Sequence, residues 1–241
     1  MLLVPTNEQI DQFIPNALSS WSSSLKHLAS SLVEHYDMVP LEWCHFMGQM
    51  GHETNGLSLA NMRENMNFRT ARRILQVYRY RLNLCLNKVN SGKVDEPAWV
   101  EGKSVEYMAQ YLIGKPEELA RIVYGGREGT PWYQGHLYIG RGPTQITHKD
   151  NYEAISNEIA KQPNVNFIDL VAKPELLEEP EWGVRSAFAD WNIKGLKKYA
   201  LADQTDRVSA ALNTGSPNRI DITNGLQSRR LWTSKAKRIW L

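Results

Sequence analysis

The spacing of apolar and polar residues predicts helices along most of the chain. Apolar side chains recur every three or four positions from Leu25 to Tyr36, and the same spacing places Trp232 and Trp240 on one face. Residues 6–9, Thr-Asn-Glu-Gln, match the capping box that starts a helix. We expect helices after Thr6, over 25–36, from Pro40 to Glu53, and over 69–80, 104–113, 116–123, 143–157, 181–192, 204–212 and 227–240.

Two segments break this pattern. Residues 83–103 are polar and contain Gly and Pro, which predicts a loop or a surface insertion. Residues 125–142 are rich in Gly and aromatic residues, and we expect irregular structure with a short strand near Tyr138. The predicted fold class is therefore mainly α, a helical domain with a small β element and a substrate cleft. Since no linker or repeat is visible, we expect one domain over residues 1–241.

Composition supports a folded chain. The 241 residues are 42% hydrophobic and 22% charged, with a net charge of +2, which excludes a largely disordered protein. The two cysteines, Cys44 and Cys85, form no disulfide framework and have no zinc-ligand spacing. Residues 219–241 hold six basic residues against one acidic residue. This segment is either a basic helix that attracts an anionic surface or, as we favour, a core helix with a solvated basic face.

The chain shows no signal peptide and no apolar run of membrane-spanning length. We therefore expect synthesis in a cytoplasm, with delivery by another component if the substrate lies elsewhere.

The first segment with candidate chemistry is residues 47–56, Met-Gly-Gln-Met-Gly-His-Glu-Thr-Asn-Gly. The glycines and Asn55 predict a helix end, so Glu53 lies where a helix gives way to a loop. A carboxyl group beside apolar residues is a candidate general acid, because desolvation favours the neutral form of an acid. A solvated surface glutamate is the alternative. His52 faces another direction, and we expect it to make a structural hydrogen bond.

The second segment is residues 138–152, in which two glycines flank Arg141. If Pro143 starts a helix, Gln145, Thr147 and Asn151 lie along a polar surface with Tyr152 as an aromatic wall. The alternative is a tight connection around a buried arginine. The segment fits a phosphate-binding loop poorly, because no Gly-Lys-Ser/Thr ending follows and there is no dinucleotide-binding pattern.

Together these segments resemble the family 19 glycoside hydrolases, which include chitinases and many bacteriophage endolysins. Gly-Arg-Gly-Pro-Thr-Gln-Ile-Thr, followed by Asn-Tyr, comes downstream of Gly-His-Glu-Thr, as in that family. Residues 63–68 and 116–127 are similar to its phage-type branch. Residues 211–215 and 228–230 are similar to its late segments, so the resemblance covers roughly residues 5–241.

The resemblance implies a role for each matching residue. Glu53 matches the general acid, and Thr147 matches the hydroxyl residue that helps to hold the attacking water. For the base, the resemblance points to Glu128 in a loop that departs from the family pattern, with Glu64 as the alternative. Glu128 could also be an exposed acid paired with Arg127. The implied substrate-binding residues are Gln145, Asn151, Tyr152, Asn213 and Arg229.

The implied reaction is inverting hydrolysis of β-1,4-linked N-acetylated sugars by two carboxyl groups about 6.5–9.5 Å apart. We expect peptidoglycan glycan strands as the partner, because the phage-type segments are present and plant-style cysteines, a secretion signal and a chitin-binding module are not. Such an endolysin stays in the host cytoplasm until holin-type release gives it access to the periplasm and cell wall. We expect a monomer without metal or cofactor, nucleic-acid partner or stable membrane insertion.

Other functions remain open at this point. The chain could be a chitinase of the same family, or a wall-binding protein that has lost catalysis. An amidase or endopeptidase would need a zinc triad or a Cys/His pair, and the six scattered histidines show no such spacing.

Overall fold

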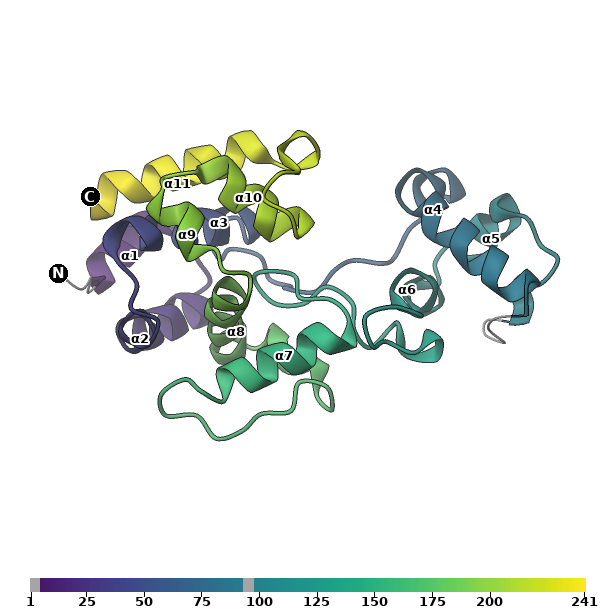
Figure 1. The fold of residues 1–241 in the computed structure, drawn as a ribbon, viewed down its shortest axis with the longest axis horizontal. Helices are drawn as coiled ribbons and strands as arrows, with labels where there is room; N and C mark the ends of the chain where they lie inside the picture. The colour runs from purple at the N-terminus through teal and green to yellow at the C-terminus, as the bar shows by residue number, and fades with distance from the viewer. Residues whose placement is uncertain (1–4, 93–97) are drawn as a thin grey trace. The chain divides into compact units, whose positions relative to one another are not determined.

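The computed structural model describes residues 5–92 and 98–241. Within them the chain is mainly helical (Figure 1). The α-helices are α1 (Asn7–Phe13), α2 (Ser19–His35), α3 (Pro40–Glu53), α4 (Ala71–Asn90), α5 (Val105–Tyr111), α6 (Pro116–Tyr124), α7 (Lys149–Ile159), α8 (Pro180–Ile193), α9 (Lys197–Leu201), α10 (Thr205–Thr214) and α11 (Leu226–Trp240). Short 3-10 helices are η1 (Ala98–Val100), η2 (Trp132–Gln134), η3 (Pro174–Glu178) and η4 (Ile220–Ile222).

The chain divides into two compact units. Unit 1 consists of Met1–Met62, Gly142–Gln145 and Ala154–Leu241, and unit 2 consists of Arg63–Arg141 and Ile146–Glu153. Each unit has a hydrophobic core of its own. The single catalytic domain expected from the sequence stays a prediction.

Helix α3 lies in the core of unit 1, and α11 packs along it. Two glycines of α3 permit this close packing. A Cβ atom on Gly48 would lie 2.2 Å from Oγ1 of Thr233, and one on Gly51 would lie 2.4 Å from the ring of Trp232. Glycines three positions apart share one helix face, so α11 lies directly on α3. The interpretation of the basic terminal segment as a core helix is confirmed, since Trp240 is buried.

In unit 2, α4 packs against α5 and α6, with Leu82 and Met108 buried between them. The guanidinium of Arg81 donates hydrogen bonds to the carbonyl oxygens of Val123 at 2.8 Å and Gly125 at 3.0 Å. These carbonyls lie at the end of α6, where backbone acceptors lack helical partners. Arg81 thereby fixes the start of the loop that carries Glu128.

Helix α4 is longer than predicted. It continues to Asn90, well into the segment 83–103 that we expected to be a loop or insertion. The reason is that Cys85 and Val89 continue the helical spacing and are buried on its core face. The part of that prediction over 93–97 lies outside the described residues.

Helix α7 starts at Lys149, later than predicted. Pro143 lies instead in a four-residue turn, closed by hydrogen bonds from the N–H of Arg141 to the carbonyl of Ile146 (3.1 Å) and back (2.9 Å). The strand expected near Tyr138 is also wrong, because the described residues contain only isolated β-bridges. Helix α2 begins at Ser19, six residues before its predicted start, and the other expected helices form within two residues of their predicted bounds. The mainly α fold class is confirmed.

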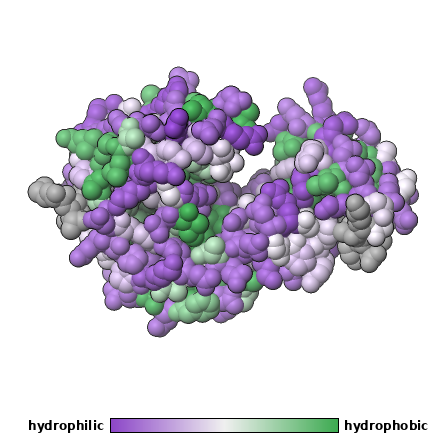
Figure 2. Space-filling view, viewed as in Figure 1, coloured by the Kyte–Doolittle hydropathy of each residue, from purple (hydrophilic) through white to green (hydrophobic). Residues whose placement is uncertain are grey.

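Hydrophilic residues cover most of the face shown in Figure 2, and hydrophobic residues gather there in small patches. Single exposed hydrophobic side chains such as Tyr80, 76% exposed, are ordinary on a protein surface. Phe167, 67% exposed, differs because it lines a cavity. None of the described helices combines the length and apolar character needed to cross a membrane.

Candidate active site

The residues singled out from the sequence are shared between the two units. Unit 1 holds Glu53, Gln145, Asn213 and Arg229, and unit 2 holds Glu64, Glu128, Thr147, Asn151 and Tyr152.

Glu53 is the last residue of α3, as the sequence predicts. The helix ends here because the Thr54 side chain forms hydrogen bonds with backbone groups at the helix end. Its hydroxyl donates to the carbonyl of Met50 at 2.6 Å and accepts from the N–H of Leu57 at 2.8 Å. The Glu53 side chain is 18% exposed, so its carboxylate is accessible but mostly surrounded by protein.

A buried guanidinium fixes the Glu53 carboxylate. Arg229 is 1% exposed and donates to Oε1 of Glu53 at 2.5 Å, to Oε1 of Gln49 at 2.7 Å and to the carbonyl of Asn224 at 2.9 Å. Gln49 in turn donates to the hydroxyl of Ser209 at 3.2 Å, which connects α3 to α10. A planar guanidinium with several acceptors has one stable orientation. Oε1 of Glu53 is therefore held in place, and among the described residues no group donates to Oε2.

The role expected for Arg229 needs correction. The resemblance assigns it to substrate binding, but a side chain that is 99% buried with three protein acceptors has no free donor surface for a sugar. It positions Glu53 instead.

His52 makes a structural contact, as expected. Its Nδ1 lies 2.9 Å from the hydroxyl of Ser228. Burial, and then the positive charge of Arg229, lower the pKa of His52. The imidazole is consequently neutral at pH 7, and Ser228 is its partner rather than a substrate group.

Two predicted substrate-binding residues of unit 1 are exposed. Oδ1 of Asn213 accepts from the N–H of Asn224 at 2.9 Å, which leaves its amide donor available. Gln145 has a positive φ of 54°, and its amide donates to the carbonyls of Met62 (3.3 Å) and Gly142 (3.0 Å). Gln145 therefore stabilises the turn and offers mainly its amide oxygen to a ligand.

In unit 2, neutral donors surround Glu64. The hydroxyl of Tyr78 donates to Oε1 at 3.1 Å, and the hydroxyl of Tyr124 donates to Oε2. The N–H of Gly140 approaches Oε2 at 3.4 Å. Burial, and then the negative charge of Glu64, raise the pKa of both phenols, so they remain donors at any physiological pH. Glu64 is a half-buried carboxylate in one fixed orientation.

Glu128 has a more open environment. Its side chain is 42% exposed, its φ is +46°, and Oε1 accepts from Arg127 at 2.6 Å. Burial alone would raise the pKa of Glu128, but the Arg127 hydrogen bond and the charges of His148 and Arg127 outweigh it and lower the pKa. The arrangement matches an exposed loop acid paired with Arg127, which the sequence also allowed.

Glu128 does lie beside two residues predicted to share its site. The amide of Asn151 donates to Oε2 of Glu128 at 3.3 Å and to the carbonyl of Thr147 at 2.8 Å. The structure thus brings Glu128, Asn151 and Thr147 together in unit 2.

Tyr152 is not the aromatic wall that we expected. It is completely buried, its hydroxyl donates to the carbonyl of Ile139 at 2.7 Å, and Arg141 donates to it at 3.1 Å. Arg141 is itself buried and also donates to the carbonyl of Leu137. The alternative interpretation, a tight connection around a buried arginine, is the one that the structure adopts.

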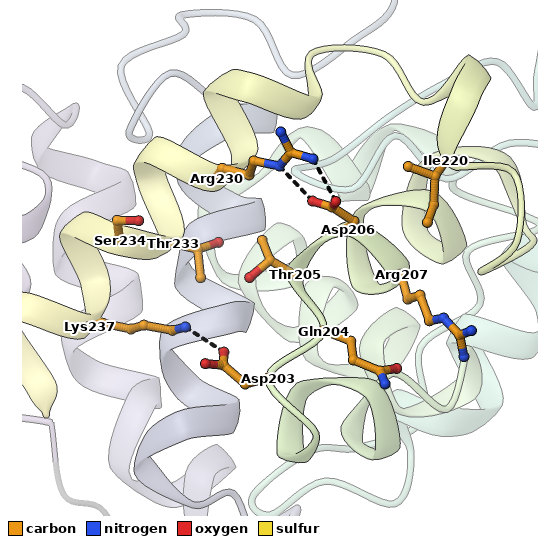
Figure 3. Close-up of a pocket in the computed structure, with 10 residues that line it drawn as sticks. All are labelled: Asp203, Gln204, Thr205, Asp206, Arg207, Ile220, Arg230, Thr233, Ser234 and Lys237. Atoms are coloured by element: carbon orange, nitrogen blue, oxygen red, sulfur yellow. Dashed lines mark hydrogen bonds and ion pairs between the residues drawn. The ribbon is translucent and has the colours of Figure 1, made fainter.

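A polar cavity of about 560 Å³ in unit 1 also contains carboxylates (Figure 3). Arg230 pairs with Asp206 through two hydrogen bonds, at 2.7 and 2.6 Å, and Lys237 pairs with Asp203. Asp203 also lies 2.8 Å from Nε2 of the buried His45. These ion pairs connect α11 to α10 and to the segment that precedes α10. No group of three potential metal ligands occurs within residues 5–92 and 98–241.

Sequence reasoning missed Gln49, Tyr78 and Tyr124. Gln49 could have been found, because it precedes Glu53 by four positions and so shares its helix face. The two tyrosines carry no local signal, since their contact with Glu64 depends on how α4 and α6 pack.

Comparison with solved structures identifies the fold. A crystal structure of chitinase C from Streptomyces griseus HUT6037 matches with 18% identity and a TM-score of 0.50, covering 98% of this chain and 91% of that one. A glutamate-to-glutamine mutant of chitinase C matches over the same shares, with 16% identity and a TM-score of 0.50. A bacterial family 19 chitinase matches with 16% identity and a TM-score of 0.48, covering 98% and 94% of the two chains.

No family model and no curated protein sequence matches this chain. The structural matches show that the chain has the fold of chitinase C. The resemblance inferred from the sequence motifs is confirmed at the level of the fold.

Proposed function

We propose that this protein is a glycoside hydrolase that cleaves β-1,4 bonds between N-acetylated sugars, with Glu53 as its general acid. The observation that carries the proposal is the Glu53 carboxyl group at the end of α3. One oxygen is held by the buried Arg229, and the other is left for a ligand. The chitinase C fold and the family 19 motifs around Glu53 support the same assignment.

The chemistry needs one proton donor and one proton acceptor. Glu53 donates its proton to the glycosidic oxygen, and the bond between that oxygen and the anomeric carbon breaks. Water attacks the anomeric carbon, and a carboxylate removes a proton from that water. This single displacement inverts the configuration and regenerates the enzyme after one proton exchange with solvent.

For the base, the contacts favour Glu64. A general base must be ionised and held in orientation before the reaction. Both Glu64 and Glu128 accept hydrogen bonds on both oxygens, but Glu64 is half-buried among neutral donors, whereas Glu128 is 42% exposed and paired with Arg127. Glu128, with Asn151 and Thr147, remains the second candidate.

For the substrate, we propose the glycan strands of bacterial peptidoglycan and an endolysin role in host lysis. The phage-type segments at 63–68 and 116–127 support this choice. Chitin is the other candidate, because it shares the N-acetylated β-1,4 backbone and the structural neighbours are chitinases.

Mass spectrometry of fragments released from purified peptidoglycan tests the proposal. We expect fragments with a new reducing-end sugar, an inverted anomer in fresh product, and faster initial hydrolysis of peptidoglycan than of colloidal chitin. Faster hydrolysis of chitin would replace the substrate and retain the enzyme class. Release of peptides without a new reducing end would overturn the glycosidase assignment.

A further inference from the structure

A cavity of about 510 Å³ in unit 1 has no part in the proposed catalysis. It lies between the segment after α7 and the first turn of α8. Its size falls within the range of about 300–1,000 Å³ typical of ligand pockets. Its lining consists of Asn164, Val165, Asn166, Phe167, Ile168, Asp169, Ala172, Lys173, Leu176 and Trp182.

Aromatic surface is open to solvent in this cavity. Phe167 is 67% exposed, and Trp182 on α8 is half-buried. An exposed phenylalanine on a loop has no folding advantage, because it leaves apolar area in water. Two aromatic side chains that line one cavity offer flat apolar surface to a ligand.

The polar groups of the cavity are also available. Among the described residues, none forms a hydrogen bond or ion pair with the side chains of Asn164, Asn166, Lys173 or Trp182. Asp169 differs, because its Oδ1 accepts from the backbone N–H groups of residues 171 and 172 at 2.9 Å each. The lining carries one acid and one base, so its net charge is zero. A neutral ligand with hydrogen-bonding groups fits this lining better than an ion.

The loop that forms the cavity is firmly attached to unit 1. Gln162 donates to the hydroxyl of Tyr36 at 3.0 Å and to the carbonyl of Arg185 at 2.9 Å. The N–H of Leu170 donates to the hydroxyl of Ser156 at 3.0 Å, and Leu170 is fully buried. Both ends of the loop are thus fixed, so a ligand would meet a preformed surface and lose less free energy in ordering it.

We propose that this cavity is an accessory site that binds an N-acetylated sugar of a glycan strand. The apolar C–H face of the sugar lies on Trp182 and Phe167, and its acetamide and hydroxyl groups exchange hydrogen bonds with Asn164 and Asn166. The site holds polymer on unit 1 while cleavage occurs elsewhere. The inference rests on the proposed function for its ligand class but not on the identity of the catalytic residues.

Titration of the Glu53→Gln protein with a soluble N-acetylglucosamine hexamer, followed by NMR of the indole N–H signals, tests the site. We expect the Trp182 signal, assigned with Trp182→Phe, to shift. A cellohexaose titration at the same concentrations should leave it in place, because that oligomer lacks acetamide groups. The proposal would be overturned if the Trp182 signal did not shift with the N-acetylated hexamer, or shifted equally with both oligomers.

A second measurement uses binding to insoluble peptidoglycan. We expect Phe167→Ala with Trp182→Ala to weaken binding about 5–10-fold, the effect of losing one or two aromatic contacts. Tyr80→Ala, which removes an exposed aromatic ring outside the cavity, should leave binding unchanged. Equal losses in both proteins would overturn the site. If wild-type protein cleaves no glycan but Trp182 still responds to the hexamer, the proposed function fails and the sugar site stands.

Discussion

Glu53 in unit 1 and Glu64 in unit 2 are carboxylates fixed by opposite means. Glu53 contacts a buried guanidinium that cannot lose its charge, whereas Glu64 contacts two phenols and a backbone N–H, all neutral. A permanent charge holds the Glu53 carboxylate firmly, but removing either partner of the buried ion pair costs much stability. Neutral donors fix position at a smaller energetic penalty and leave the carboxylate free to accept a proton. The difference suggests that the two carboxyl groups have different chemical tasks.

The largest expected effect comes from Glu53→Gln. The amide oxygen keeps the hydrogen bond from Arg229, but the side chain has no acidic proton to give. We expect turnover to fall roughly 10²–10⁴-fold, while the circular dichroism spectrum shows that the helical fold is retained. Reducing-sugar release from peptidoglycan measures the effect, and exposed Glu175→Gln is the matched control. Retention of more than about a tenth of the activity would remove Glu53 from the mechanism.

The base is distinguished by a pair of variants in unit 2. We expect Glu64→Gln to reduce turnover by roughly 10²-fold or more, because the amide cannot accept the proton of water. Glu128→Gln should cost much less, since its carboxylate is already paired with Arg127 at the surface. The same reducing-sugar assay measures both. The reverse order of effects would assign the base to Glu128 and its neighbours Asn151 and Thr147.

The two environments should also differ in stability. Arg229→Leu leaves the acceptors on Gln49 and Glu53 without a partner, and we expect a loss of about 3 kcal/mol in the free energy of unfolding. Tyr124→Phe removes one neutral donor from Glu64, and we expect a loss of about 1 kcal/mol. Urea unfolding monitored in both variants measures the difference. Equal losses would show that the charge on Arg229 has no special role.

The smallest expected effect is a pH dependence that both units share. Burial lowers the pKa of His45 in unit 1, and burial also lowers the pKa of His148 in unit 2. The unfolded chain therefore binds protons first as the pH falls below about 6.5, which favours unfolding. We expect urea midpoints to fall from pH 7.5 to 5.5. His45→Gln should reduce this dependence and exposed His27→Gln should not. A midpoint that rises on acidification would contradict the assignment.

The sequence was most informative where one local signal decides the structure. The capping box at Thr6, Pro40 at a helix start and Glu53 at a helix end were all predicted correctly. Each depends on a few neighbouring residues. The motif that contains Glu53 also indicated the correct fold, which this chain shares with chitinase C.

The errors occurred where distant contacts decide the structure. The turn at Pro143 depends on hydrogen bonds from Gly142 and Gln145 to the carbonyl of Met62, which is distant in the sequence, and helix propensity does not report such contacts. Tyr152 and Arg229 match family motifs, and both proved to be buried supports for other residues. A motif identifies which residues belong to a site but does not say which of them contact a ligand.

Unit 1 consists of segments that lie before and after unit 2 in the sequence, so its two main parts are synthesised at different times. Arg229 follows Glu53 by 176 positions, which corresponds to roughly 9–35 s of synthesis at about 5–20 residues per second. Throughout that interval the glycine face of α3 has no α11 against it, and the whole chain of unit 2 is synthesised before α11. The guanidinium that fixes Glu53 therefore arrives last. A ribosome-bound chain that lacks α11 should hold a formed unit 2 before its acid is in place, so the synthesis of α11 times the appearance of activity.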